Sequence, residues 1–136
     1  MSVANMKKTL KREDILAGFI SNLIHDYEHP GFSNSFVIRT KHPLSIRYND
    51  QSVLENHHVA AAYSLLNKDE NNIFSSLDHN LKFYIRKLII EVVLATDLSQ
   101  HFLILTKLKT QLDNNFPTTS QEDQTLLVKL LLKLSD

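Results

Sequence analysis

The chain has 136 residues, of which 43% are hydrophobic and 22% are charged, enough for one globular domain with a modest core. Its 15 basic and 15 acidic side chains balance to zero net charge, so no overall field attracts nucleic acid or an anionic membrane. Cysteine is absent, which excludes disulfides and thiolate metal sites and leaves any metal to nitrogen and oxygen ligands, for which seven histidines are available.

No apolar run approaches the roughly 18 uninterrupted residues that a membrane span needs. The longest runs, near residues 88–95 and 126–134, are interrupted by Glu91, Lys129 and Lys133. Residues 1–12 are basic but lack the apolar core and cleavage site of a secretory signal, and we expect them to be an N-terminal extension. The expectation is a cytoplasmic protein whose domain occupies residues 13–136.

Glycine and proline are rare and strand-like alternation is scarce, which predicts an all-α fold, a compact multi-helix bundle. Apolar residues at helical spacing predict a first helix over residues 13–29, which Pro30 ends. Asn34 follows this turn and is expected to fix it through side-chain to backbone hydrogen bonds. Pro43 suits the first position of a short helix that extends through Tyr48.

The second half of the sequence predicts longer helices. Ser52 and Glu55 have the spacing of a capping box, which opens a helix to about Leu66. The remaining expected elements are a brief helical turn over residues 71–77, one long core helix over residues 81–112, a loop over residues 113–121 and a leucine-rich helix from residue 122 to the end. The last helix is apolar almost all round and therefore requires neighbours on most sides.

A histidine and a carboxylate, His25 and Asp26, lie next to each other at the predicted end of the first helix, and His29 follows closely. Such a pair can bind a divalent cation, and the second carboxylate oxygen can bridge to another. Pro30 and Gly31 enforce a sharp exit that leaves the three side chains clustered. For so short a motif, a solvated or capping pair at a helix end is the alternative interpretation.

Three separated blocks of the sequence extend this motif. They are LIHDYEHPGFSN (residues 23–34), YNDQSVLENHH (residues 48–58) and VVLATDLS (residues 92–99). In this order and spacing they resemble the catalytic core of class I 3′,5′-cyclic nucleotide phosphodiesterases. The resemblance implies metal-dependent hydrolysis of cAMP, cGMP or both to 5′-monophosphates in signal transduction.

The resemblance also implies site residues. In that family two divalent ions, usually Zn²⁺ and Mg²⁺ (or Mn²⁺), activate a bridging water as hydroxide, which attacks the cyclic phosphodiester. By position, Asp26 is the bridging ligand, and His25 and Asp136 are ligands of the zinc. The side chains that match positions holding the waters of the second ion are His29, Glu55, Thr96 and Asp97.

Some of these residues have alternative interpretations. Asp136 is equally explained as an acid at the end of a leucine helix, and Glu55 as a member of the capping box alone. Asp97 interrupts an apolar helix, where an unpaired carboxylate is costly, and therefore needs a partner or an exposed position. We do not assign His57 and His58 as metal ligands, because a histidine on the apolar side of a helix is usually a hydrogen-bonded core residue, and the resemblance implies that this pair is structural or supports the ligands from behind.

The sequence also departs from the family it resembles. The upstream histidine–asparagine pair and the further histidine of the family motif are absent, so no catalytic general acid is assigned. The glutamine and aromatic clamp that hold the purine are absent as well, because they lie beyond Asp136. We therefore expect at most three of the four protein ligands to the first ion, weak metal binding, and little or no turnover by this polypeptide alone.

Three functions are consistent with these observations. The first is the central piece of a cyclic nucleotide phosphodiesterase, with a cyclic nucleotide as substrate and no nucleic acid partner. The second is a non-catalytic remnant that acts as a helical interaction module and allows helix-mediated self-association. The third is a metal phosphohydrolase for other phosphoesters, which the blocks around Glu55 and Thr96 fit poorly.

Overall fold

The structure, a computed structural model, describes residues 9–113 and 120–136. Every regular element in these two ranges is helical, which confirms the predicted all-α class. The elements are α2 (Arg12–Ile24), α3 (Asn34–Arg39), α4 (Pro43–Arg47), α5 (Val53–Leu66), the 3₁₀ helix η1 (Asp69–Asn71), α6 (His79–Leu94), the 3₁₀ helix η2 (Leu98–Gln100), α7 (His101–Leu112) and α8 (Gln121–Ser135). Pro43 occupies the first position of α4, as predicted.

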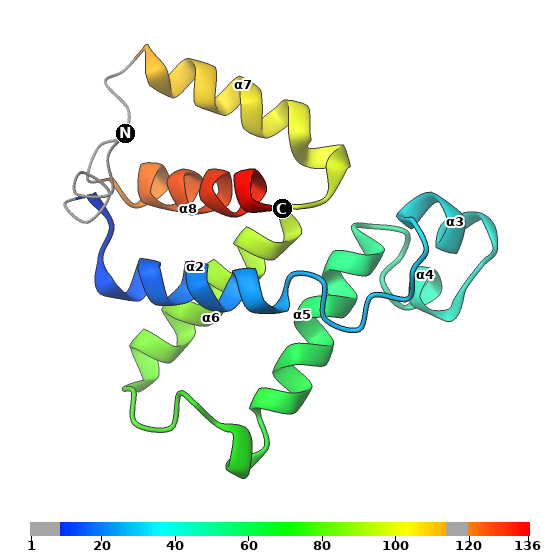
Figure 1. Cartoon of the computed structure of the whole chain (residues 1–136), viewed down its shortest axis with the longest axis horizontal. Helices are drawn as coiled ribbons and strands as arrows, with labels where there is room; N and C mark the ends of the chain where they lie inside the picture. Colours follow the sequence, from blue (N-terminus) through cyan, green and yellow to red (C-terminus); the bar gives the residue numbers. More distant parts are fainter. Residues whose placement is uncertain (1–8, 114–119) are drawn as a thin grey trace.

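Helix α6 forms the centre of the bundle. Helix α2 makes its most extensive contact with α6, α8 contacts both of them, and α5 packs against α6. Figure 1 shows α8 between α2 and α7, with the C-terminus near the corner where α6 gives way to α7. The apolar core between these helices consists of Ala17, Ile20, Val59, Tyr63, Ile85, Leu88, Ile89, Val92, Val93, Val128 and Leu132.

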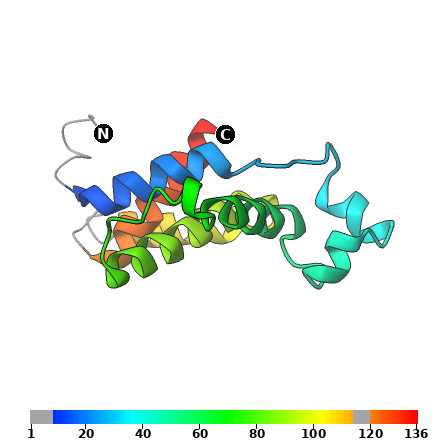
Figure 2. The same ribbon diagram turned by 90° about the horizontal axis from the view of Figure 1, so that it is seen from below.

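Helices α3 and α4 form a small lobe at the start of α5. Val37 of α3 is fully buried against Val53 and Leu54 of α5. Figure 2 shows this lobe at one end of the molecule, joined to the bundle by the segment after α2 and by the loop into α5. The sequence analysis did not predict α3, whose six residues are too few to show a clear helical period.

The predicted single core helix over residues 81–112 is wrong. Helix α6 ends at Leu94, and the helices on either side of the break are bent by 89°. Asp97 begins the new segment, because its Oδ1 accepts a hydrogen bond from the amide of Ser99 at 2.8 Å. Its Oδ2 accepts from the hydroxyl of Ser52 at 2.6 Å, so this buried carboxylate has the partners that it needs.

In the part of the chain that the structure describes, no single helix is long and apolar enough to cross a membrane. The helices on the two sides of this corner meet the length and composition criteria only when they are taken together as a bent pair.

The first helix is also shorter than the predicted range 13–29. It ends at Ile24, and residues 25–28 form a turn in which the amide of His29 donates to the carbonyl of Asp26 at 3.0 Å. Glu28 has a φ of 59° and Gly31 a φ of 78°, so the chain leaves the helical region before Pro30. His25, the C-cap of α2, still has helical backbone angles, so the turn proper follows it.

The predicted capping box at α5 is wrong as well. Ser52 has a left-handed backbone (φ 39°) and makes no side-chain cap to α5, because its hydroxyl bonds to Asp97 instead. The amide of Leu54 donates to the side-chain oxygen of Asn34, 20 residues earlier, at 2.9 Å. The cap of α5 therefore comes from a distant part of the sequence.

The remaining differences are small. The helical turn expected over residues 71–77 is preceded by η1, and residues 73–76 form a turn. Helix α8 begins at Gln121, one residue before the predicted start, and Ser120 caps it by accepting from the amide of Asp123. Most of the loop predicted over residues 113–121 lies outside the described residues.

Candidate metal centre

The turn after α2 and the end of α8 bring together the three side chains predicted to bind the first ion. The Nε2 atom of His25 lies 3.6 Å from Oδ2 of Asp26 and 3.2 Å from Oδ1 of Asp136. Potential ligand atoms of the three residues all lie within 4.8 Å of one another. Asp136, the most distant of them in sequence, therefore lies beside His25 in the folded chain.

The orientation of His25 is that of a metal ligand. Its Nδ1 lies 2.8 Å from the carbonyl oxygen of Asn22, which can only accept, so Nδ1 carries the proton. Nε2 then faces the carboxylates of Asp26 and Asp136, and these nitrogen and oxygen atoms form a group that can hold a metal ion. The donor set fits a divalent ion with nitrogen and oxygen ligands.

Asp26 belongs to a second group of ligands, which it forms with His29 and His58. Nε2 of His58 is 4.0 Å from Oδ1 of Asp26, and the rings of His29 and His58 are stacked with centroids 5.5 Å apart. The side chain of Asp26 is 65% exposed, so both of its oxygens are open to ligands. One carboxylate is thus shared by two groups of atoms that can each hold a cation.

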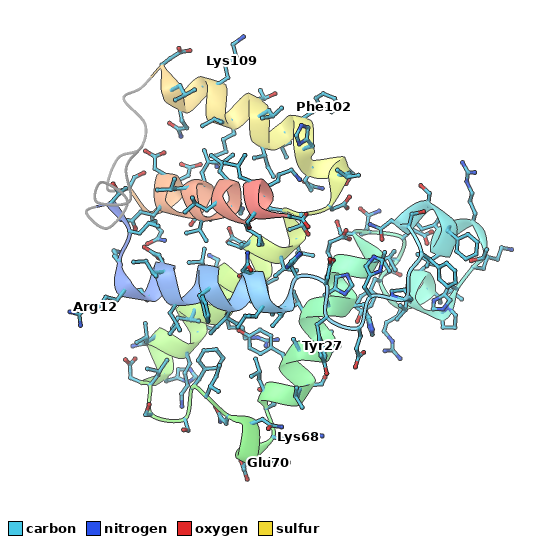
Figure 3. The ribbon with its side chains drawn as sticks, in the orientation of Figure 1. Arg12, Tyr27, Lys68, Glu70, Phe102 and Lys109 are labelled. Atoms are coloured by element: carbon cyan, nitrogen blue, oxygen red, sulfur yellow. The ribbon has the colours of Figure 1, made fainter. Side chains whose placement is uncertain are left out.

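His58 is a site residue that the sequence analysis left out. It is 2% exposed, and its Nδ1 lies 2.7 Å from the carbonyl of Tyr27, which Figure 3 shows beside α5. Burial lowers the pKa of His58 below its usual value and keeps the ring neutral, with the Nε2 lone pair toward Asp26. The predicted hydrogen-bonded core histidine is confirmed, and the same bond aims its other nitrogen at the cluster.

Glu55 is held at the edge of this cluster by Asn34. The side-chain amide of Asn34 donates to both carboxylate oxygens of Glu55, at 3.2 and 2.9 Å. Burial raises the pKa of Glu55 above its ordinary value, against the opposing effect of the hydrogen bonds from Asn34. The charges of Asp97 and His29 also act on this carboxyl, which places all three groups in one neighbourhood.

Asp97 is held by a separate set of partners. Burial favours the neutral acid, but hydrogen bonds from Ser52 and Ser99 and the charge of Lys133 outweigh it, so the pKa of Asp97 lies below its ordinary value. The hydroxyl of Thr96 donates to the carbonyl of Val93 at 2.8 Å, within its own helix end. Asp97 is therefore a fixed anion.

The predicted residues thus fall into two sets. His25, Asp26 and Asp136 form one group of ligand atoms, and Asp26, His29 and His58 form the other. Among the described residues, neither Glu55 nor Asp97 belongs to a group whose ligand atoms all lie within 4.8 Å. Their carboxylates are already engaged by Asn34 and Ser52. Contacts of this kind suit side chains that hold water near a cation rather than touch it.

The sequence of this all-helical chain is similar to those of known proteins. The chain belongs to the 3′5′-cyclic nucleotide phosphodiesterase family, whose sequence model matches residues 1–136.

Two named relatives define the similarity more closely. The chain is 40% identical over 136 residues to the probable 3′,5′-cyclic phosphodiesterase pde-3 of Caenorhabditis elegans, an alignment that covers 98% of this chain and 20% of that protein. It is 40% identical over 126 residues to the cGMP-inhibited 3′,5′-cyclic phosphodiesterase 3A of Homo sapiens, covering 90% of this chain and 11% of that protein. The chain thus spans a fifth or less of the length of these relatives.

Proposed function

We propose that this chain carries the metal-binding part of a 3′,5′-cyclic nucleotide phosphodiesterase, a hydrolase that converts cAMP, cGMP or both to 5′-monophosphates. The observation that supports the proposal best is the shared carboxylate of Asp26, whose oxygens belong to two groups of potential ligands. A pair of cations bridged by one carboxylate is an arrangement that catalyses phosphodiester hydrolysis, because both charges act on one phosphoryl group.

Each residue of the cluster has a defined part in the proposal. His25 donates from Nδ1 to the Asn22 carbonyl and presents Nε2 to the first ion, together with Asp136. Asp26 faces both ions. When bound, the cations neutralise phosphoryl oxygens and lower the pKa of a water between them. His29, Glu55, Thr96 and Asp97 are proposed to hold the waters around the second ion.

The chemistry of the ligands supports zinc at the first position and magnesium or manganese at the second. An imidazole with two carboxylates suits zinc, which accepts nitrogen and oxygen ligands at short distances. The acids around the second position are engaged by neutral hydrogen-bond donors, which suits an ion that keeps much of its hydration shell. The cytoplasmic location stays a prediction.

Metal binding by the purified chain tests this proposal. Calorimetric titration with Zn²⁺ and Mn²⁺ should detect binding that Asp26→Asn weakens for both ions and His25→Ala weakens chiefly for zinc. Each substitution should weaken binding by more than the roughly 10–100-fold that is lost when a residue hydrogen-bonded to a metal ligand is changed. A matched control is Glu70→Gln, which removes an exposed charge at the opposite end of α5 and should leave both affinities unchanged.

Hydrolysis of cAMP and cGMP should then be measured on this chain and on a version extended at both ends. Hydrolysis that depends on Asp26 in either form supports the proposal. A failure of both ions to bind, in the chain and in the extended version, contradicts it.

One observation favours the second function, a helical interaction module that self-associates. Segments η2 and α7 expose apolar side chains, among them Leu98 of η2 (82%) and Phe102 (79%) and Leu103 (67%) of α7. Figure 3 shows Phe102 and Lys109 on the side of α7 that faces away from α8. Sedimentation at increasing concentration should reveal association that Phe102→Ser abolishes. A monomer at all concentrations would contradict this second function.

A further inference from the structure

A lysine of α8 reaches across to the corner between α6 and η2. Nζ of Lys133 donates to the carbonyl oxygens of Ala95 at 3.2 Å and Thr96 at 3.4 Å. Carbonyls at the end of a helix have no partner within the helix and carry its partial negative charge, so a lysine ammonium stabilises them. Both bonds join segments that lie 37 and 38 residues apart in sequence.

This corner connects two parts of the candidate metal centre. Lys133 lies three residues before Asp136, and the carbonyls that it binds directly precede Asp97. Helix α8 delivers Asp136 to His25 at 3.2 Å, while the corner delivers Asp97 to Ser52 at 2.6 Å. The charge of Lys133 also acts on the carboxyl of Asp97. A shift of the corner along α8 would therefore change the spacing between these two acids.

A second lysine provides a natural comparison. Lys129 lies one turn before Lys133 on the same face of α8, and its Nζ contacts a carboxylate oxygen of Glu91 on α6 at 3.3 Å. This ion pair also joins α8 to α6, but it does not touch the corner. Because the pair is partly exposed, it contributes little to stability. Lys133 therefore bonds to backbone carbonyls of the corner, whereas Lys129 pairs with a side chain of α6.

We propose that Lys133 is a positioning residue that locks the Thr96–Asp97 corner to the end of α8 and thereby fixes Asp97 relative to Asp136. The inference rests on the proposed function, because the proposed role of this contact is to position residues of the metal centre. Lys133 itself touches neither cation nor substrate. It acts through the backbone carbonyls of the corner.

The test combines amide hydrogen exchange with metal titration of the whole chain. In Lys133→Met the amides of Ser99 and Gln100, which bond to Asp97, should exchange about tenfold faster, since the lost hydrogen bonds involve a charged donor. The affinity for Mn²⁺ should fall by about tenfold, as for other residues that orient a metal centre. Lys133→Arg should restore both values, because its fork can donate to the same two carbonyls.

Lys129→Met is the matched control and should leave exchange at the corner and Mn²⁺ affinity unchanged. Circular dichroism of each variant verifies that the helices are intact. Unchanged exchange and unchanged affinity in Lys133→Met would overturn the proposal, and so would equal effects of Lys129→Met. If the unchanged chain binds no Mn²⁺, the proposed function fails, while the exchange rates still decide whether Lys133 locks the corner.

Discussion

The strongest stability prediction concerns Asn34, because this one side chain supports both the start of α5 and the carboxylate of Glu55. Replacing it with alanine removes the acceptor for the amide of Leu54, a cap worth about 1 kcal/mol. It also removes two hydrogen bonds to the Glu55 carboxylate, worth about 1 kcal/mol more after allowance for partial exposure. We expect Asn34→Ala to lower the free energy of unfolding by about 2 kcal/mol, or roughly 8 °C in Tm.

Urea unfolding followed by circular dichroism measures this loss, with the slope against urea as a check that the unfolded state is unchanged. Asn22→Ala is the control, because it removes an exposed bond to Ser135 and should cost less than about 0.5 kcal/mol. Asn34→Asp keeps an acceptor for Leu54 but sets a second carboxylate against Glu55. Its deficit should therefore shrink as the pH falls and Glu55 becomes protonated. A loss below about 0.5 kcal/mol in Asn34→Ala would refute this account of the α5 cap.

Three further predictions follow from the packing and the electrostatics. The pKa of Asp97 lies below its ordinary 3.8, so the ionised carboxylate stabilises the fold above that pH, and this contribution is lost as the pH falls through the folded-state pKa. The loss of unfolding free energy in Asp97→Asn, measured by urea unfolding, should therefore be largest at neutral pH and vanish in acid. A loss that does not change with pH would contradict this. A Cβ added at Gly18 would lie 3.1 Å from a methyl carbon of Val128. The change in unfolding free energy caused by Gly18→Ala should therefore be more favourable by about 1 kcal/mol in a Val128→Ala background than in the unchanged chain. Additive effects of the two substitutions in a double-mutant cycle would exclude the contact. Zn²⁺ at about 100 times its dissociation constant should stabilise the chain by about 2.7 kcal/mol in thermal unfolding, and an equal gain in Asp26→Asn would show that the ion binds elsewhere.

The local parts of the site were predictable from the sequence. His25, Asp26 and His29 lie within five consecutive residues before a proline and a glycine, and the turn places Asp26 near both histidines, although the two histidines belong to different groups of ligand atoms. The apolar periods of α5 and α8 were equally clear, because helical spacing is a property of neighbouring residues. The resemblance to a family added Asp136, Glu55 and Asp97 as site residues. No local sequence pattern connects these acids to His25 and Asp26.

Two of the structural errors share one cause, which is competition from distant side chains. Apolar residues at helical spacing lie on both sides of residues 95–97, but Asp97 finds its partner in Ser52, 45 residues away, and the helix breaks there. The spacing of Ser52 and Glu55 matched a capping box, yet both side chains bond to residues outside α5. Sequence patterns describe neighbouring residues, so they do not predict a hydrogen-bond partner that comes close only in the folded chain.

The sequence by itself determined the helical class and the placement of Asp26 near His25 and His29, because each depends on residues within a few turns of one another. The tertiary structure decided which side chains complete the cluster. It turned the buried ring of His58 toward Asp26, brought Asp136 to His25, and bent the chain at Asp97. These arrangements depend on contacts between segments more than 30 residues apart, which only the packed fold brings within hydrogen-bonding distance.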